Sequence, residues 1–119
     1  MKVLVLGGTG MLGHKVYQTL SERFPNVFCT IRQTKQDEQI AKISLLQADA
    51  VIESVNAEDL NSVAAVLEKV RPEVVVNCVG IIKQRSEAKA SLPSITVNSL
   101  LPHWLAEQCA AWGGRLIHV

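Results

Sequence analysis

Short, continuous apolar runs alternate along the chain with longer stretches in which apolar residues recur every three or four positions. Uninterrupted apolar runs are typical of strands buried on both faces, as in a parallel sheet. They occupy residues 3–6, 27–31, 50–52, 74–79 and 116–119. Helical periodicity follows the first four of them, at 12–24, 33–47, 60–70 and 97–108. The alternation predicts an α/β fold, a Rossmann-type doubly wound parallel sheet truncated after about five strands, in the order 3-2-1-4-5.

Helix-breaking and helix-capping residues stand between these segments. Pro25 follows the first helical stretch, and the run from Asn56 to Asp59 is typical of an N-cap with an acidic first turn. Pro72 stops the next helix, and Gly113 follows the last one. The stretch 33–47 opens with polar residues, so its helical pattern is the weakest of the four.

The composition narrows the class of protein. A length of 119 residues suits a single domain, residues 1–119, and an apolar share of 48% supplies its core. The 12 basic and 11 acidic residues nearly balance, which does not predict a nucleic-acid partner. No apolar run is long enough to cross a bilayer, and the N-terminus does not resemble a signal peptide, so no membrane partner is expected.

The cysteines indicate a reducing compartment. Cys29, Cys78 and Cys109 are widely spaced, and none belongs to a Cys-x-x-Cys pair. This spacing predicts neither a disulfide framework nor a metal site. Cys29 and Cys78 lie within or beside apolar runs and are predicted to be buried, reduced thiols. The pattern favours a cytoplasmic enzyme.

A glycine-rich loop joins the first strand to the first helix, and it carries the main functional signal. Its glycines fit G-x-G-x-x-G when read from Gly8, and G-x-x-G-x-x-G when read from Gly7. In both patterns the glycines allow a tight turn and let the backbone approach a pyrophosphate closely, directly before a helix N-terminus. The predicted dinucleotide-binding residues here are Gly7, Gly8, Thr9, Gly10, Met11, Leu12 and Gly13.

The sequence of this loop admits two other interpretations. It could be a tight strand-to-helix turn that binds nothing. It could also be a P-loop, because Gly8 and Gly13 have the required spacing, but His14 occupies the position of the phosphate-binding lysine. The position of the loop, directly after a buried strand, favours the dinucleotide.

The end of the second strand indicates which dinucleotide binds. An acidic residue about 20 positions beyond the glycines would hold the ribose hydroxyls of NAD. The chain has Arg32 in this region, and the first carboxylate is Asp37. A guanidinium suits a 2′-phosphate, which predicts NADP(H) rather than NAD(H), with Lys35 as a second candidate contact. The alternative is that Arg32 is a solvated loop residue.

The glycine loop, the stretches 75–80 and 96–98, and the terminal 115–119 occur in the order typical of one family. Together they resemble an extended short-chain dehydrogenase/reductase. Within that group the chain is most similar to the dTDP-4-dehydrorhamnose reductases and related nucleotide-sugar reductases of surface polysaccharide synthesis. The resemblance covers the whole chain but only the first half of such an enzyme, so the catalytic and substrate-binding part is expected to be absent.

The resemblance implies further site residues. By this resemblance, Asn77, Val79 and Gly80 at the end of the fourth strand would line the adenosine and nicotinamide riboses. Cys78, which lies between them in the sequence, is also predicted to be a cofactor-binding residue. Asn98 would support the active site, unless it is an ordinary helix asparagine. Two positions depart from the family: Leu6 replaces a frequent threonine that braces the loop, and Asn56 replaces an aspartate that contacts adenine.

The family's chemistry needs residues that this chain does not contain. Such reductases use a Ser or Thr after the fifth strand and a Tyr-x-x-x-Lys on the next helix. Tyr17 is the only tyrosine here and lies on the apolar stripe of the first helix. No catalytic residue is therefore assigned, and the chain alone is predicted to be inactive. None of the three histidines has a partner at the spacing typical of metal ligands or of a catalytic triad; they are His14, His103 and His118.

The predicted function is the dinucleotide-binding part of an NADPH-dependent reductase of a keto-sugar nucleotide. One alternative is an NAD-dependent nucleotide-sugar epimerase or dehydratase, which Arg32 disfavours. Another is a non-catalytic NADP-binding sensor or scaffold. Lys83 and Arg85 could face phosphates or lie in a solvated loop. The expected partners are the cofactor and a nucleotide-sugar substrate. A second copy of the chain could also pair with the open edge at Leu116, Ile117 and Val119.

Overall fold

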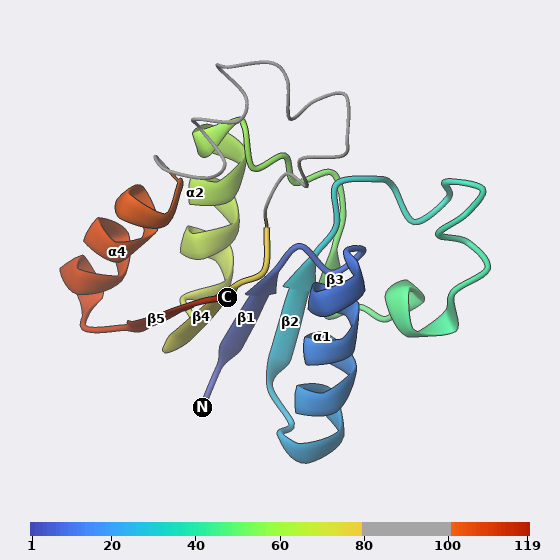
Figure 1. Ribbon diagram of the computed structural model, residues 1–119, viewed down its shortest axis with the longest axis horizontal. Coiled ribbons are helices and arrows are strands. Elements are labelled where there is room, and N and C mark those ends of the chain that lie inside the picture. Colours follow the sequence, from blue (N-terminus) through green and yellow to red (C-terminus); the bar gives the residue numbers. More distant parts are fainter. Residues whose placement is uncertain (80–100) are drawn as a thin grey trace.

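A five-stranded parallel sheet forms the centre of the computed structural model, which describes residues 1–79 and 101–119 (Figure 1). The strands lie in the order β3-β2-β1-β4-β5, so the predicted Rossmann-type topology is confirmed. Their bounds are β1 Val3–Leu6, β2 Val27–Thr30, β3 Val51–Ile52, β4 Val74–Asn77 and β5 Arg115–His118.

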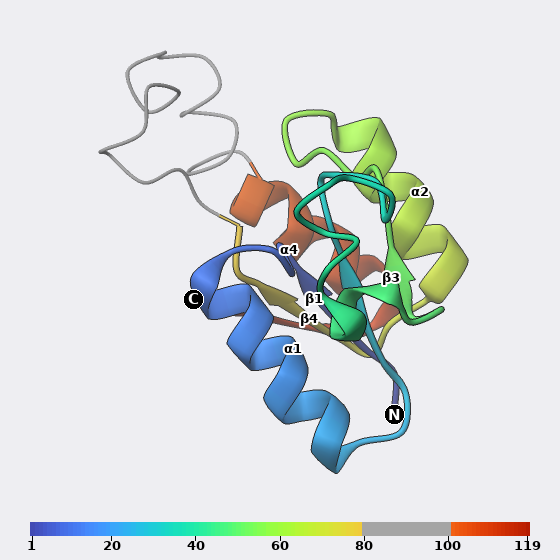
Figure 2. The same cartoon turned by 90° about the vertical axis from the view of Figure 1, so that its right-hand side faces the viewer.

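Helices cover both faces of the sheet. The helix α1 (Met11–Arg23) packs on one face, and α2 (Leu60–Val70) and α4 (Leu101–Trp112) pack on the other (Figure 2). Successive side chains of a strand point to opposite faces, so β1 contributes Val3 and Val5 to the α1 side and Leu4 and Leu6 to the α2 side. Strands β2, β3 and β4 likewise contribute to both cores, whereas β5 is mostly exposed and contributes only the partly buried Leu116, on the α2 side.

The parallel register brings the carboxyl ends of the strands to one edge. Leu6 of β1 pairs with Asn77 of β4, which in turn pairs with His118 of β5. Strand order reverses between β2 and β4 around β1, which is the place where doubly wound sheets bind ligands. The loop that begins at Gly7 starts at this point.

The prediction of a helix at 33–47 is wrong. The segment consists of turns followed by one short 3-10 helix, η1 (Ser44–Gln47). Its polar side chains bind the backbone groups that a helix would use: Lys35 Nζ donates to the Ala48 carbonyl, and Gln47 Nε2 donates to the carbonyls of Lys35 and Ile40. Ile40 and Leu46 are buried, so the apolar residues of this segment anchor it to the core instead of forming one face of a helix.

Several predicted boundaries need smaller corrections. The N-cap of α2 is Asp59, whose side chain accepts from the Asn61 backbone N–H, and not Asn56. Arg71 ends this helix in the left-handed conformation (φ +53°), directly before Pro72. Strand β4 stops at Asn77, two residues before the end of its apolar run, and β3 is shorter than predicted by one residue.

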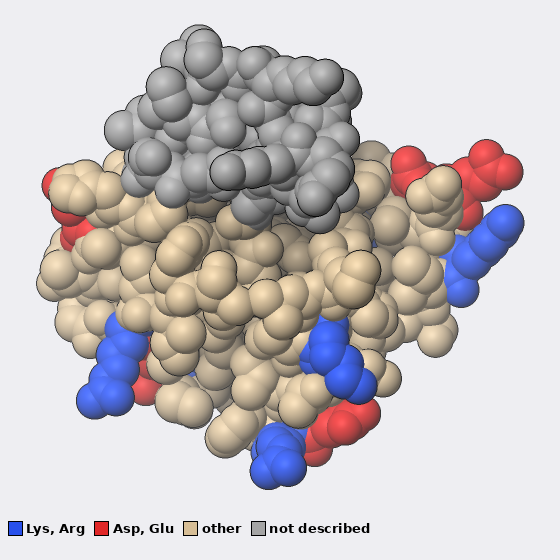
Figure 3. Space-filling view, viewed as in Figure 1, with Lys and Arg blue, Asp and Glu red and all other residues tan. Residues whose placement is uncertain are grey.

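The surface observations leave two predictions open. On the face in Figure 3, the basic side chains lie near the periphery, several of them close to acidic ones. Strand β5 lies at one end of the sheet, and its Ile117 is 51% exposed, so self-association along this edge stays a prediction. None of the helices described at 1–79 and 101–119 is long and apolar enough to span a membrane.

Candidate functional site

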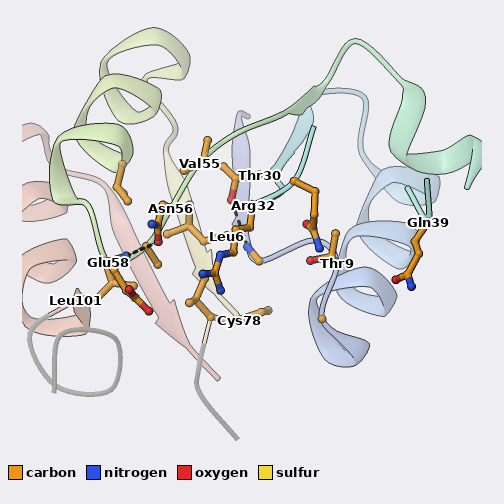
Figure 4. Close-up of a pocket in the computed structure, with 16 residues that line it drawn as sticks. Leu6, Thr9, Thr30, Arg32, Gln39, Val55, Asn56, Glu58, Cys78 and Leu101 are labelled. Carbon is orange, nitrogen blue, oxygen red and sulfur yellow. Dashed lines mark hydrogen bonds between the residues drawn. The ribbon is translucent and has the colours of Figure 1, made fainter. Parts of the chain in front are cut away.

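A cleft of about 370 Å³ opens at the carboxyl ends of β1, β2 and β4, beside the glycine loop (Figure 4). The described residues that line it come from five separate parts of the chain. They are Leu6, Gly7, Thr9, Gly10, Thr30, Arg32, Gln33, Gln39, Val55, Asn56, Ala57, Glu58, Val63, Cys78, Val79 and Leu101.

Three glycines of the loop are required by the protein's own packing. Gly7 has φ +89°, a conformation that side chains disfavour. A Cβ on Gly8 would lie 2.8 Å from Cys29 Sγ, and one on Gly13 would lie 1.9 Å from the Gly7 carbonyl oxygen. Because Gly7 and Gly8 are both needed, the loop satisfies the first glycine of both predicted patterns.

Gly10 differs from these three. Within residues 1–79 and 101–119, a Cβ built on it would meet one atom within 4 Å, the Gly7 oxygen at an ordinary 3.6 Å, and its φ of −67° suits any residue. The fold therefore does not require glycine here. Gly10 lines the cleft and precedes the first turn of α1, so the missing side chain leaves room in front of a helix N-terminus. The packing of the described residues therefore gives no reason for a glycine at this position.

The N-termini of α1 and α2 are organised differently. Asp59 caps α2 through its side chain, whereas Gly10 brings no side chain to α1. The first turn of α1 also contains no acidic residue. The first backbone N–H groups of a helix lack partners within the helix and carry a partial positive charge, which suits a phosphate. The residues at the start of α1 thus fit the pyrophosphate of a dinucleotide.

Thr30, at the end of β2, braces the loop from below. The Gly7 N–H donates to Thr30 Oγ1 at 3.3 Å, and the Gly8 N–H donates to the Thr30 carbonyl at 2.7 Å. Thr30 is almost fully buried. It supplies a hydroxyl brace where Leu6 lacks one. Sequence reasoning missed this role because Thr30 is 23 residues from the loop.

Arg32, the residue predicted to select the cofactor, lines the cleft (Figure 4). Its side chain is exposed, and within residues 1–79 and 101–119 no carboxylate forms an ion pair with it. Lys35 is not part of the cleft lining, because its Nζ donates to the Ala48 carbonyl at 2.9 Å. The predicted second cation is thus engaged elsewhere.

Gln33, beside Arg32, has a buried Oε1 with no hydrogen-bond partner in the described part of the chain. It lines the cleft, where a ligand could satisfy this atom. A glutamine amide can present its oxygen or its NH2 after a simple flip, so Gln33 suits a hydroxyl and a phosphate equally.

Asn56 faces the cleft from the opposite side (Figure 4). Its Oδ1 accepts from the Glu58 N–H at 3.0 Å, and its backbone is tied to the Ser62 hydroxyl. The side-chain oxygen therefore stabilises a turn, which an aspartate could do equally well. Glu58, which sequence reasoning did not single out, also lines the cleft and is exposed.

The residues at the end of β4 and directly after it have two different roles at the cleft. Cys78 and Val79 line the cleft, whereas Asn77 is fully buried and is not among the lining residues. Asn77 Oδ1 accepts from the Val79 N–H at 3.1 Å, and its Nδ2 lies 3.1 Å from His118 Nδ1. Gly80, Asn98, Lys83 and Arg85 lie outside the described residues.

Burial makes the cysteines poor nucleophiles. It raises the pKa of the Cys29 thiol to about 12, with a small opposing influence from Lys35, and it also raises the pKa of Cys78 and Cys109. All three are free thiols. Cys29 is buried as predicted, but Cys78 is only half-buried, because it follows β4 and borders the cleft.

A second recess of about 410 Å³ lies on the other side of the loop, between α1 and the segment 33–47. It shares Thr9, Gly10, Gln33 and Gln39 with the main cleft, and its further lining residues include Met11 and His14. Met11 is 95% exposed, and Leu12, which is half exposed, borders neither opening.

The remaining candidate residues are structural. Tyr17 is buried in the core between α1 and the sheet, where burial first and then Cys29 raise its pKa. His103 pairs with Glu107 one helical turn away on exposed α4. Among the described residues, no cluster of three metal-ligating side chains occurs.

The profile of one protein family, the RmlD substrate binding domain, matches residues 1–119. The chain belongs to this family. The resemblance to nucleotide-sugar reductases is thereby confirmed at the level of the family. No curated protein matches the chain significantly.

Solved structures with the same fold include L-threonine 3-dehydrogenase from Trypanosoma brucei (TM-score 0.79, 20% identity, covering 98% of this chain and 35% of the other). UDP-glucose 4-epimerase from Thermus thermophilus, in complex with NAD, has a TM-score of 0.71 at 22% identity, covering 95% and 35%. A hypothetical dTDP-4-dehydrorhamnose reductase from Sulfolobus tokodaii has a TM-score of 0.73 at 17% identity, covering 99% and 38%. The chain thus spans little more than a third of the length of these proteins.

Proposed function

We propose that this chain binds NADP(H) as the dinucleotide-binding part of a reductase that acts on a keto-sugar nucleotide. The observation that carries the proposal is Gly10. Its missing side chain is not required by packing, and it opens the cleft in front of the uncapped N-terminus of α1. A pyrophosphate placed there would accept hydrogen bonds from backbone N–H groups.

The choice of NADP(H) rests on Arg32. A guanidinium offers paired, charge-assisted hydrogen bonds to a phosphate, and this one borders the cleft with no described carboxylate bound to it. An NAD site would favour an acidic residue at the end of β2. Glu58 is the acidic residue that lines the cleft, and it precedes α2 instead of following β2.

The reductase activity is proposed from family membership together with the cofactor. Bound NADPH supplies a hydride, and the protein supplies binding and orientation. The glycine loop and α1 would hold the pyrophosphate, Arg32 the 2′-phosphate, and Val79 would border the ribose. The proton donor would come from residues that this chain does not contain, so we expect no NADPH oxidation by the chain itself with any keto-sugar nucleotide.

Calorimetric titration with NADPH and NADH tests the binding proposal directly. We expect NADPH to bind the more tightly, and Gly10→Val to weaken binding at least 100-fold, because the valine would occupy the phosphate position. Ala110→Val is the matched control, since it adds bulk on the exposed surface of α4. Unchanged binding by Gly10→Val, with both variants folded, would mean that the loop is only a turn.

Whether the parent protein is an enzyme is tested by the residues that follow position 119 in the gene. A Ser or Thr followed by a Tyr-x-x-x-Lys supports an enzyme over a sensor or scaffold, and NADPH oxidation with a keto-sugar nucleotide then checks the reductase. A preference for NAD in the titration above would instead favour an epimerase or dehydratase, such as the NAD-containing Thermus structure. Tight NADPH binding without any catalytic motif would favour a sensor or scaffold.

A further inference from the structure

We propose that His118 is a positioning residue of the nucleotide cleft. As a neutral imidazole with its hydrogen on Nε2, it accepts a hydrogen bond from the buried Asn77 amide and so holds the Val79 backbone at the cleft wall. The proposal rests on the proposed nucleotide binding, because it concerns the same cleft. The pattern of the sequence leaves His118 without any partner, and the structure supplies one 41 residues away.

The orientation of the Asn77 amide follows from its other contact. The Val79 backbone N–H can only donate, so the atom that it meets at 3.1 Å must be the Asn77 oxygen. The amide nitrogen therefore points to His118 Nδ1, at 3.1 Å. Because an amide NH2 can only donate, Nδ1 must carry no hydrogen, which fixes the tautomer of the ring.

Burial makes this contact important. Asn77 has no exposed surface, so its NH2 cannot bond to water instead while a side chain of similar size stays in the place of His118. A buried donor without a partner is costly, and the amide would move to recover one. The backbone adds a second link between the strands, since the Val119 N–H donates to the Asn77 carbonyl at 3.1 Å. His118 itself is exposed, so its side chain can be changed without opening the core.

The same amide connects to the cleft. Its oxygen holds the Val79 N–H, and Val79 lines the cleft directly against the glycine loop. A Cβ on Gly7 would lie only 3.1 Å from Val79 Cγ2, which shows how closely these two walls approach. A shift of the Asn77 amide would therefore move Val79 relative to Gly7, at the place where the dinucleotide is proposed to bind.

Two substitutions of His118 with similar size distinguish the role of its hydrogen-bond acceptor from the role of its bulk. In His118→Asn, the side-chain oxygen takes the position of Nδ1 and can still accept from Asn77. In His118→Leu, a methyl group takes that position and cannot. We expect His118→Leu to weaken NADPH binding about three- to tenfold and to accelerate amide hydrogen exchange at Val79. His118→Asn should bind within about twofold of the unaltered protein and retain Val79 protection.

Nitrogen NMR of the histidine ring supplies a measurement that needs no ligand. At about pH 8, where histidine side chains are ordinarily neutral, we expect His118 to carry its hydrogen on Nε2. In Asn77→Asp, both carboxylate oxygens are acceptors, so the ring should instead place a hydrogen on Nδ1. This variant keeps the proposal testable if His118→Leu fails to fold.

Three results would overturn the proposal: a hydrogen on Nδ1 in the unaltered protein, unchanged binding and Val79 exchange in His118→Leu, or equal losses in the Leu and Asn variants. Equal losses would mean that the shape of the side chain matters and not its acceptor. If the unaltered protein binds no dinucleotide, the proposed function fails, whereas the tautomer and the Val79 exchange still decide the role of His118.

Discussion

The two walls of the cleft are built in different ways. The first wall is backbone: the loop from Gly7 to Gly13 and the start of α1, which come from one short piece of chain and carry no charged side chain. The second wall is made of side chains, including Arg32, Asn56 and Val79, which follow three different strands. Only long-range sheet pairing brings this second set together.

This difference separates two tasks in recognition. Backbone N–H groups at a helix N-terminus attract any phosphate, so the loop wall would account for the proposed binding of a dinucleotide. Side chains with distinct charge and hydrogen-bonding groups discriminate between ligands, so the other wall would decide which dinucleotide binds. Changes in the loop wall should therefore affect folding or all nucleotides alike, and changes in the side-chain wall should affect the preference.

The largest effect is expected inside the loop wall, from Gly13→Ala. The new Cβ would lie 1.9 Å from the Gly7 oxygen, so the loop or α1 must move. We expect the free energy of unfolding to fall by about 3 kcal/mol in urea denaturation. Gly10→Ala is the matched control, with an expected loss below about 1 kcal/mol, because its Cβ has room. Equal losses would contradict the distinction between packing and ligand-facing glycines.

The next effect tests the side-chain wall through Arg32→Glu. The charge reversal should weaken NADPH binding about 30-fold and leave NADH binding within about threefold, because only NADPH has a 2′-phosphate. Arg23→Glu, at the far end of α1, should change neither affinity. Competitive titration measures both constants. A preference that stays the same in Arg32→Glu would show that another residue selects the cofactor.

Asn56→Asp should have a smaller effect on affinity, and this effect should depend on the base of the dinucleotide. The turn should survive, because a carboxylate can still accept from the Glu58 N–H. The amide NH2 becomes an acceptor, which suits the 6-amino group of adenine better than the 6-oxo group of hypoxanthine. We expect the affinity ratio of NADPH to its hypoxanthine analogue to rise about threefold. An unchanged ratio would place the base away from Asn56.

Cys29 packs beneath Gly8, and replacing it should leave the pH dependence of stability unchanged near neutral pH and alter it only at high pH. Burial raises the pKa of this thiol from 9.0 to about 12, so the folded state favours the protonated form. Its contribution to stability is complete below pH 9 and should be lost as the pH rises from 9 to 12. Cys29→Ala should show a shallower decline than the unaltered protein in urea denaturation across this range. Tyr17, whose pKa is also raised, will account for part of the remaining decline.

Local patterns sufficed for the elements with strong, unambiguous signals. The strands were predictable because buried parallel strands need continuous apolar runs, and the loop because its glycines follow such a run directly. The structure of the segment 33–47 was not predictable from local patterns. Its Ile40 and Leu46 are spaced as in a helix, but Lys35 and Gln47 form hydrogen bonds to the backbone that this spacing does not reveal.

The sequence by itself determined the α/β alternation, the strand order that goes with it, the glycine loop and the placement of Arg32 at the end of β2. These depend on residues that are neighbours in the chain. Only the tertiary structure decided that Thr30 braces the loop, that Lys35 is engaged elsewhere, and that Asn77 supports the cleft from within. Each of these roles depends on a hydrogen bond between residues far apart in sequence or on burial, and both exist only once the strands have paired.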